Sequence, residues 1–541
     1  MSTKAFQRVF WVVLDGMGYE LARRCISTGR FSALSRIQSQ GHLGFARPAS
    51  PVCQTPPALL TLFSGEEPAQ SGVWGYYMPD PKRREASVSG FHAKPRRIST
   101  LWDALEQRGQ GYALMNVAYR NDPVWSSRGS HLEFGYDGYR LWQKPAAFRL
   151  DQRGRRINYR GIAFTLAPSA DGVVILKGSS VRARLAEGEG KVVQFTQGLR
   201  AFAHLLDRSV LIIHPLNKAV IRGSVEGTAA ADGFLDTNVF RVVRRLNERR
   251  SAKSASRYSA DSAEYRGAKS AGYVGADASL SVAAEMMPSA LCMAQKSELM
   301  SAAIANERSR LVVGYFPLID ELNHAYFDLL ETEWPDGRVS ELYCASVALV
   351  DQLLHRIMQA AGRDTLVVVS SDHGAASSRK LLHFNELLAA EGIVKRSGEA
   401  YDLPRSAAFY HPSDCGQVVA RHDADRAAVL AGLQRALKRA HEEFGIDIGV
   451  QEGGRDDPYI AFLFPLGDGY FTGNHPGRGR PTLDGGRRGG HHLSPLSPTP
   501  WIQAMLGLWS PRSAALAREL PAIPVDNKDV KSFLLEVMGE M

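Results

Sequence analysis

The sequence has 541 residues, of which 44% are hydrophobic, and no apolar run approaches the roughly 20 residues that cross a bilayer, so we expect no membrane association. The net charge of +9 would suit nucleic-acid binding, but basic residues are spread widely and no helix-turn-helix, zinc-finger or RNA-binding signature is visible, so a small anionic substrate explains the charge equally well. Five cysteines without a CxxC pair argue against a disulfide framework, and because the first residues lack a signal-peptide pattern the sequence predicts a soluble, cytoplasmic protein.

Three continuous apolar runs, rich in β-branched and aromatic residues, predict strands buried on both faces of a parallel sheet. Each run leads to an acidic residue: residues 9–14 to Asp15, residues 311–316 to Asp320, and residues 365–370 to Asp372. In an open α/β sheet the ligand crevice lies outside the carboxyl ends of the strands, so these carboxylates can converge. Helical patterns at 340–361 and 383–392 indicate a layered sheet with helices on both faces.

Two stretches interrupt this α/β core, and both are candidate cap modules over the crevice. Short alternating segments from about 146 to 225 predict a β-rich insertion, and residues 249–281, rich in Ser, Ala and charge, predict a flexible connection. The second insertion has a strand-like run at 417–420 and a helical pattern at 424–444. The predicted division is core in 1–145, 301–392 and 471–541, the β-rich insertion with its connection in 146–300, and the second insertion in 393–470.

Acidic and imidazole side chains recur at the predicted strand ends. The candidate metal ligands are Asp15, Asp320, His324, Asp372, His373 and the late pair His491 and His492, which follows the glycine-rich residues 485–490. The four-residue spacing of Asp320 and His324 lets both side chains point at one metal ion. Carboxylate oxygen with imidazole suits zinc, manganese or iron, and no thiolate site competes.

Each of these residues also has a simpler explanation. Asp15-Gly16 after a strand is a common turn signal, and Asp320 with His324 can be a helix cap beside a surface histidine. The run Asp372-His373-Gly374 after so apolar a strand is harder to explain in this way. Because all of these residues stand at strand ends, a shared functional site is the better interpretation.

The segment from Pro51 to Gly65 offers a candidate nucleophile. Pro56 and Pro57 suit the first turn of a helix that runs through Leu62, so Thr55 should lie at or just before the N-cap. Free backbone amides and the helix dipole at such a position favour an anionic phosphate. Taken alone, an ordinary threonine cap explains the same pattern.

These segments together resemble the alkaline phosphatase superfamily and, within it, the type I phosphodiesterase and nucleotide pyrophosphatase branch. Asp15-Gly16 matches the ligand after the first strand, and Asp372-His373-Gly374 is the family's Asp-His-Gly. Residues 55–65 resemble its Thr-Phe-Pro-Asn nucleophile segment with the closing Gly, and Gly72 falls where that segment's His-Gly stands. Residues 320–324 resemble its Asp-x-x-Gly-His. The resemblance covers the core pieces, about half of the chain.

The resemblance implies a three-layer, alkaline-phosphatase-like α/β core and a metal-dependent phosphoric ester hydrolase, similar to phosphodiesterases and nucleotide pyrophosphatases. Asp320, His324 and a C-terminal histidine would hold one divalent ion, most simply zinc, with manganese or iron as alternatives. Asp15, Asp372, His373 and the Thr55 oxygen would hold a second. Thr55 would form a covalent phosphothreonine on a small phosphate-ester substrate.

The last ligand of this implied set is a choice between two neighbouring histidines. Residues 492–495, His-Leu-Ser-Pro, resemble the His-Gly-Ser-Pro pattern found before the final core strand in some relatives, here residues 502–509. We therefore choose His492 over His491, which would then be a supporting or surface residue.

Departures from the family pattern concern the oxyanion contacts. Ala58 replaces an Asn that often helps to hold the phosphoryl oxygens, and Asn323 replaces the Gly before the ligand histidine. We expect support from elsewhere, such as a backbone amide just after Thr55 or an arginine of the loop that contains Arg478, Arg480, Arg487 and Arg488. That loop could equally be a solvated segment.

Several alternative functions remain open. A sulfatase-like site would use Cys53, but the Pro required two residues on is Thr55 and the Arg required four residues on is Pro57. A phosphomonoesterase or phosphonate hydrolase would use the same site, and a degenerate metal- or phosphate-binding protein would lack ligands that are present here. The natural substrate and the oligomeric state do not follow from the sequence.

Overall fold

The computed structural model describes residues 6–80, 87–92, 98–115, 117–119, 129–132, 146–149, 154–159, 162–186, 190–196, 199–207, 210–216, 221–222, 297, 300–301, 303–305, 309–336, 338–398, 400–411, 416–421, 424–454, 459–466, 469–473, 482–484, 489–492, 494–496, 498–512, 516 and 520–540. The predicted connection at 249–281 and all four loop arginines between 478 and 488 lie outside these residues. Within the described part of the chain, no helix is both long enough and apolar enough to span a bilayer.

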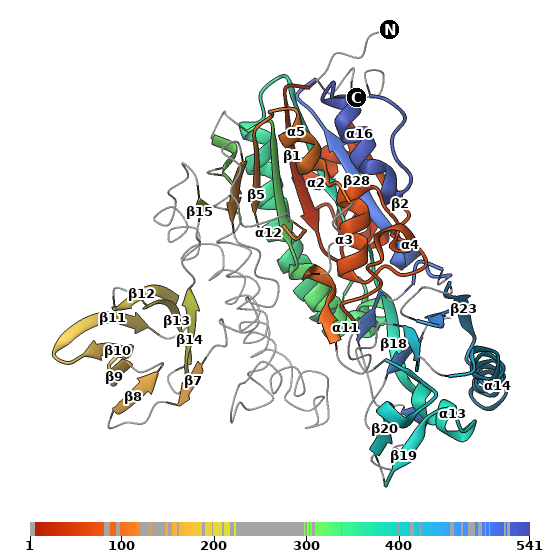
Figure 1. Cartoon of the computed structure of the whole chain (residues 1–541). Helices are drawn as coiled ribbons and strands as arrows, with labels where there is room; N and C mark the ends of the chain where they lie inside the picture. The colour runs from red at the N-terminus through yellow and green to blue at the C-terminus, as the bar shows by residue number, and fades with distance from the viewer. Residues whose placement is uncertain are drawn as a thin grey trace.

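An eight-stranded sheet forms the centre of the molecule (Figure 1). Its strands are β1 (Arg8–Leu14), β2 (His42–Ala46), β5 (Tyr112–Met115), β6 (Gly129–Leu132), β15 (Ile221–Arg222), β16 (Leu311–Phe316), β17 (Thr365–Ser370) and β28 (Ala504–Trp509). The spatial order is β15-β6-β5-β16-β1-β17-β28-β2, in which β6 through β17 run parallel and β28 runs antiparallel to both neighbours. The three strands predicted from apolar runs are therefore adjacent, as β16-β1-β17.

The side chains of β1 alternate between two hydrophobic cores, one on each face of the sheet. Phe10 and Val12 point into the first core, whereas Trp11 and Val13 point into the second. The first core is covered by α1 (Tyr19–Ser27), α2 (Ser32–Gln40), α11 (Leu318–Glu333) and α12 (Arg338–Ala360), and the second by α3 (Thr55–Ser64), α5 (Leu101–Gln107) and α16 (Val530–Val537). The sheet is the middle of three layers, which confirms the predicted fold class.

Residues between Ala146 and Leu216 form two four-stranded antiparallel sheets that share one apolar core. The strands are β7 (Ala146–Arg149), β8 (Arg155–Tyr159), β9 (Ile162–Ser169), β10 (Gly172–Lys177), β11 (Ser180–Ala186), β12 (Gly190–Thr196), β13 (Leu199–Asp207) and β14 (Val210–Leu216). Phe164 and Ile175 from one sheet meet Leu205 and Ile213 from the other. These strands stand beside the central sheet, on the left in Figure 1.

The second predicted insertion forms a smaller α/β unit with its own core. Its elements, with the helix α13 and the strands that flank it, are β18 (Ala376–His383), α13 (Phe384–Ala390), β19 (Lys395–Ser397), β20 (Ala400–Asp402), β21 (Ala408–Tyr410), β22 (Gln417–Ala420), α14 (Arg426–Phe444), β23 (Ile448–Glu452), β24 (Ala461–Pro465), β25 (Gly469–Gly473), β26 (Leu483–Asp484) and β27 (Gly490–His491). Helix α14 begins where the Asp425 side chain accepts hydrogen bonds from two backbone amides, and it ends at Gly445, whose φ is 64°.

An aromatic cluster joins this unit to the chain on both sides of α3. The ring centroid of Trp74 lies 4.9 Å from that of Tyr459 and 5.4 Å from that of Phe462, and Val52 belongs to the same buried cluster. The second insertion therefore packs close to Thr55. The domain boundaries and the role of both insertions as caps remain predictions.

Candidate active site

Three buried carboxylates meet at one edge of the central sheet. Asp15 directly follows β1, Asp372 follows the end of β17 by two residues, and Asp320 lies in the first turn of α11, after β16. All three side chains are fully buried. Because the three strands are parallel neighbours, their carboxyl ends share an edge, and the acids converge as the sequence predicts.

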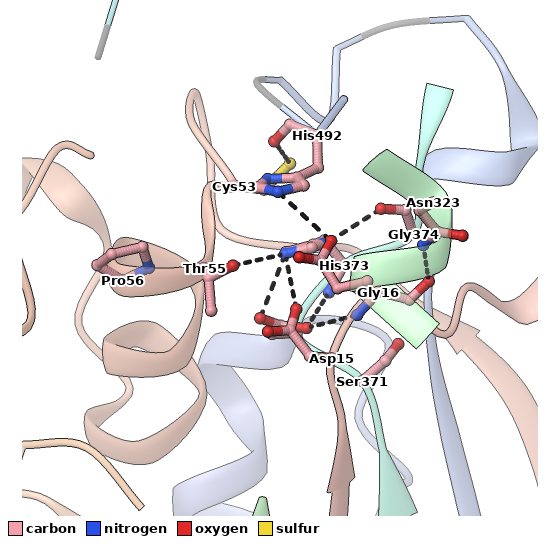
Figure 2. Close-up of polar contacts among 12 residues, drawn as sticks. Asp15, Gly16, Cys53, Thr55, Pro56, Asn323, Ser371, His373, Gly374 and His492 are labelled. Carbon is pink, nitrogen blue, oxygen red and sulfur yellow. Dashed lines mark hydrogen bonds and ion pairs between the residues drawn. The ribbon is translucent and has the colours of Figure 1, made fainter. Parts of the chain in front are cut away.

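The first cluster contains Asp15, Asp372, His373 and Thr55, and Figure 2 labels three of them, Asp15, His373 and Thr55. The Nε2 atom of His373 lies 3.3 Å from Asp15 Oδ1, 3.3 Å from Asp372 Oδ2 and 3.4 Å from Thr55 Oγ1. The other ring nitrogen, Nδ1, is 2.9 Å from the carbonyl oxygen of Gly374 and donates to it. This contact directs the lone pair of Nε2 toward the carboxylates, as a metal-ligating histidine requires.

Thr55 reaches this cluster because it opens α3. Gln54 is the N-cap and Thr55 is the first helical residue, one position later than expected, with Pro56 and Pro57 in the first turn as predicted. The Thr55 side chain is completely buried. Its hydroxyl oxygen therefore faces the cluster from the N-terminal end of the helix (Figure 2).

The second cluster contains Asp320, His324 and His492. The Nε2 atom of His324 lies 3.2 Å from Asp320 Oδ2, and the Nε2 atom of His492 lies 3.5 Å from Asp320 Oδ1. The two Nε2 atoms are 3.1 Å apart, while Nδ1 of His324 is 3.2 Å from the Gly490 carbonyl oxygen. His491 belongs to neither cluster of possible ligands in the described part of the chain, where its strand pairs with β18.

The charge balance of the two clusters fits divalent cations. Asp15 Oδ1, both oxygens of Asp320 and Asp372 Oδ2 are buried and have no hydrogen-bond partner among the described residues. No Lys or Arg of the described chain forms an ion pair with these carboxylates. Buried carboxylate oxygens that accept no hydrogen bond are costly, and the donor set of carboxylate oxygen and imidazole nitrogen suits zinc, manganese or iron ions.

Burial and mutual repulsion shift the protonation of these groups. Burial, followed by the charges of Asp372 and Asp320, raises the pKa of Asp15 well above its usual value. Burial also raises the pKa of Asp372 to about 6. For Asp320 burial acts in the same direction, but His324 and His492 outweigh it and hold the pKa below its usual range. Burial and then His373 lower the pKa of His492, which favours the neutral imidazole that binds metal.

Two residues that contact the first cluster were not predicted from the sequence. The hydroxyl of Tyr315, on β16, donates a hydrogen bond to Asp15 Oδ2. The Asn527 amide donates to the carbonyl oxygens of Ser371 at 3.1 Å and Asp372 at 3.0 Å. Tyr315 carries a weak signal as a polar group in an apolar strand, whereas nothing local marks Asn527, which is distant in sequence.

The expected oxyanion contacts need correction. A backbone amide just after Thr55 cannot serve, because Pro56 and Pro57 have no amide hydrogen and the Ala58 amide donates to Gln54 within the helix. Ala58 itself is packed in a small apolar cluster with Cys53. The Cys53 thiol is buried and lies 3.0 Å from the His492 carbonyl oxygen, to which it donates, so it supports the last ligand rather than a sulfatase-like nucleophile.

The sheet order and the acidic strand ends define an alkaline-phosphatase-like α/β protein. The solved structure of the alkaline phosphatase PafA is similar at a TM-score of 0.50, with 12% identity over 100% of this chain and 97% of that one. Phosphonoacetate hydrolase from Sinorhizobium meliloti 1021 gives 0.47 with 15% identity over 99% and 96%, and murine ectonucleotide pyrophosphatase / phosphodiesterase 5 gives 0.47 with 10% identity over 98% and 95%. No curated protein sequence matches this chain.

The family follows from the sequence match. The model of the family described as Type I phosphodiesterase / nucleotide pyrophosphatase matches residues 9–158 and 228–452, which is well over half of the chain. The chain belongs to this family, within the alkaline phosphatase superfamily. The match leaves out residues 159–227, which include strands β9 to β14 of the two antiparallel sheets.

Proposed function

We propose that this chain is a metal-dependent phosphodiesterase that acts through a covalent phosphothreonine at Thr55. Membership of the family supports a phosphoric ester hydrolase. The observation that carries the finer proposal is the 3.4 Å separation of Thr55 Oγ1 from His373 Nε2, beside two buried carboxylates. The Thr55 hydroxyl is buried at the start of a helix, among side chains that fit metal ions. A hydroxyl in this position can be activated as a nucleophile.

The residues present fit two divalent ions. Asp15, Asp372, His373 and Thr55 would hold one, and Asp320, His324 and His492 the other. When bound, the ions would lower the pKa of the attacking hydroxyl and of water and would neutralise phosphoryl oxygens. His373 lies within reach of both clusters, so its position sets how close the two groups of ligands stand.

The reaction then has two displacements at phosphorus. In the first, Thr55 Oγ loses its proton and bonds to phosphorus while the bond to the leaving oxygen breaks, and that oxygen takes up a proton. In the second, water attacks phosphorus and the bond to Thr55 Oγ breaks, which restores the hydroxyl and releases a phosphate monoester. Tyr315 and Asn527 hold Asp15 and the Asp372 backbone in place throughout.

The test compares substitutions of two buried threonines of α3. Thr55→Ala should lower turnover of a bis-aryl phosphate on the order of 10³-fold or more while the fold and most of the metal binding remain, because the carboxylate and imidazole ligands are unchanged. Thr61→Ala is the control, because Thr61 is also buried but its hydroxyl donates to the Glu66 carbonyl, away from the site. Acid quenching of the wild type during turnover should trap phosphothreonine at Thr55, detected by mass spectrometry.

Two outcomes would contradict the proposal. Wild-type activity in Thr55→Ala would exclude this nucleophile. A metal-loaded wild type that turns over no phosphate ester would instead identify a binding protein built on the same fold.

A further inference from the structure

We infer that Asn323, oriented by Tyr343, is a positioning residue that fixes the Gly16 turn and thereby the spacing of the two metal-binding clusters. The inference rests on the proposed function, because it concerns the same metal site. Asn323 is the position at which the sequence departs from the Gly of the family pattern. Its side chain is 1% exposed, and it directly precedes the candidate ligand His324 on α11.

The Gly16 backbone contacts a ligand of the first cluster and, through Asn323, the helix that carries Asp320 and His324 of the second. Its amide donates to Asp372 Oδ1 at 3.2 Å, and its carbonyl oxygen accepts from Asn323 Nδ2 at 2.8 Å (Figure 2). Asp372 belongs to the first cluster, whereas Asn323 is on the same turn of α11 as Asp320 of the second. One residue of the turn after β1 therefore links the strand end of β17 to the start of α11.

Helix α11 packs so closely against Gly16 that there is no room for a side chain at this position. A Cβ atom on Gly16 would lie 2.7 Å from Asn323 Nδ2 and 2.8 Å from the Cα atom of Asp320. Helix α11 thus rests directly on the turn that carries Asp15. A shift of the Asn323 amide must move either the turn or the helix, and with it a ligand of one cluster.

Tyr343 determines which way the Asn323 amide faces. The Tyr343 hydroxyl, fully buried on α12, donates to Asn323 Oδ1 at 3.0 Å. A protonated hydroxyl so placed selects the amide orientation in which the oxygen faces Tyr343 and the NH₂ group faces Gly16. Burial, and then the charges of Asp320 and Asp328, raise the pKa of Tyr343, so the hydroxyl keeps its proton.

A direct measurement of metal affinity tests this assignment without relying on activity. Asn323→Ala should weaken Zn²⁺ binding by roughly 10- to 100-fold, the loss typical of groups that orient metal ligands. Affinity is measured by competition with a chromophoric chelator at 25 °C, after circular dichroism has verified the fold. Tyr343→Phe removes only the hydroxyl and should give a smaller loss in the same direction.

The matched control is Asn385→Ala. Asn385, on α13, is fully buried and makes two hydrogen bonds with the backbone of Tyr410, and it lies outside both clusters. It should lower the melting temperature as Asn323→Ala does but leave Zn²⁺ affinity within about threefold.

The outcomes separate this inference from the proposed function. Unchanged affinity in both Asn323→Ala and Tyr343→Phe, or an equal loss in Asn385→Ala, would overturn the positioning role alone. If Asn323→Ala does not fold, unchanged affinity in Tyr343→Phe overturns it. A wild-type chain that binds no Zn²⁺, Mn²⁺ or Fe²⁺ would overturn both the positioning role and the proposed metal site.

Discussion

The imidazole rings of His373 and His492 are stacked, with centroids 3.9 Å apart and planes inclined by 18°. His373 comes from the end of β17 and His492 from the segment before β28, so the stack joins parts of the chain that are remote in sequence. His373 Nε2 faces Asp15, whereas His492 Nε2 faces Asp320. The stacked pair therefore forms the boundary between the two clusters.

The two late histidines should differ sharply in metal binding. His492→Ala removes a nitrogen close to Asp320 and the ring that stacks on His373, so we expect Zn²⁺ affinity to fall by at least about 100-fold. His491→Ala changes a buried residue outside both clusters and should cost no more than about tenfold. Calorimetric titration of both variants checks the ranking. The reverse order would show that His491, and not His492, is the last ligand.

Gly16→Ala should destabilise the protein far more than Gly29→Ala. Both glycines have positive φ, 68° and 69°, so each alanine incurs the left-handed cost of about 1–2 kcal/mol. A Cβ at Gly29 would meet nothing within 4 Å, whereas a Cβ at Gly16 would strike Asn323 and Asp320. We expect on the order of 3–5 kcal/mol at Gly16 in urea unfolding. Equal losses at the two positions would contradict the tight packing of α11 on this turn.

The fold was predictable from sequence because its signals are local. The apolar runs that lead to Asp15 and Asp372 strongly predict strands. Because the two strands are parallel neighbours, the carboxylates that follow them lie at the same edge of the sheet. Asn527 was not predictable, because only the tertiary fold brings it to the Asp372 backbone. The absence of usable amides after Thr55 follows from Pro56 and Pro57 and could have been read from the sequence.

Metal binding should weaken as the pH falls through about 6. Burial raises the pKa of Asp372 to about 6 and also raises that of Asp15, so below this pH a bound ion must displace protons. Because these folded-state values exceed the usual ones, the metal-free fold loses stability as pH rises from about 4 to above 6. The increase in melting temperature on adding Zn²⁺ should therefore be larger at pH 7.5 than at pH 5.

The control for this pH dependence is Asp372→Asn, which has no proton to lose. In this variant the effect of Zn²⁺ should be smaller at pH 7.5 and should change less between the two pH values. An effect of Zn²⁺ on the wild type that is the same at pH 5 and pH 7.5 would refute the link to Asp372.

A phosphodiester or nucleotide pyrophosphate analogue should be hydrolysed faster than the matching monoester. A monoester carries one more negative charge at neutral pH, and its extra oxygen needs a fixed cationic or amide partner in the transition state. Among the described residues no Lys or Arg pairs with the clusters, and Pro56 and Pro57 remove the amides that would follow Thr55.

The measurement is kcat/KM for bis-aryl and mono-aryl phosphates with the same leaving group on metal-saturated protein. A monoester preference of roughly tenfold, about 1.4 kcal/mol, would overturn the diesterase assignment. If that preference disappears when Arg478, Arg480, Arg487 and Arg488 are replaced by Ala, the loop that carries them supplies the missing contact.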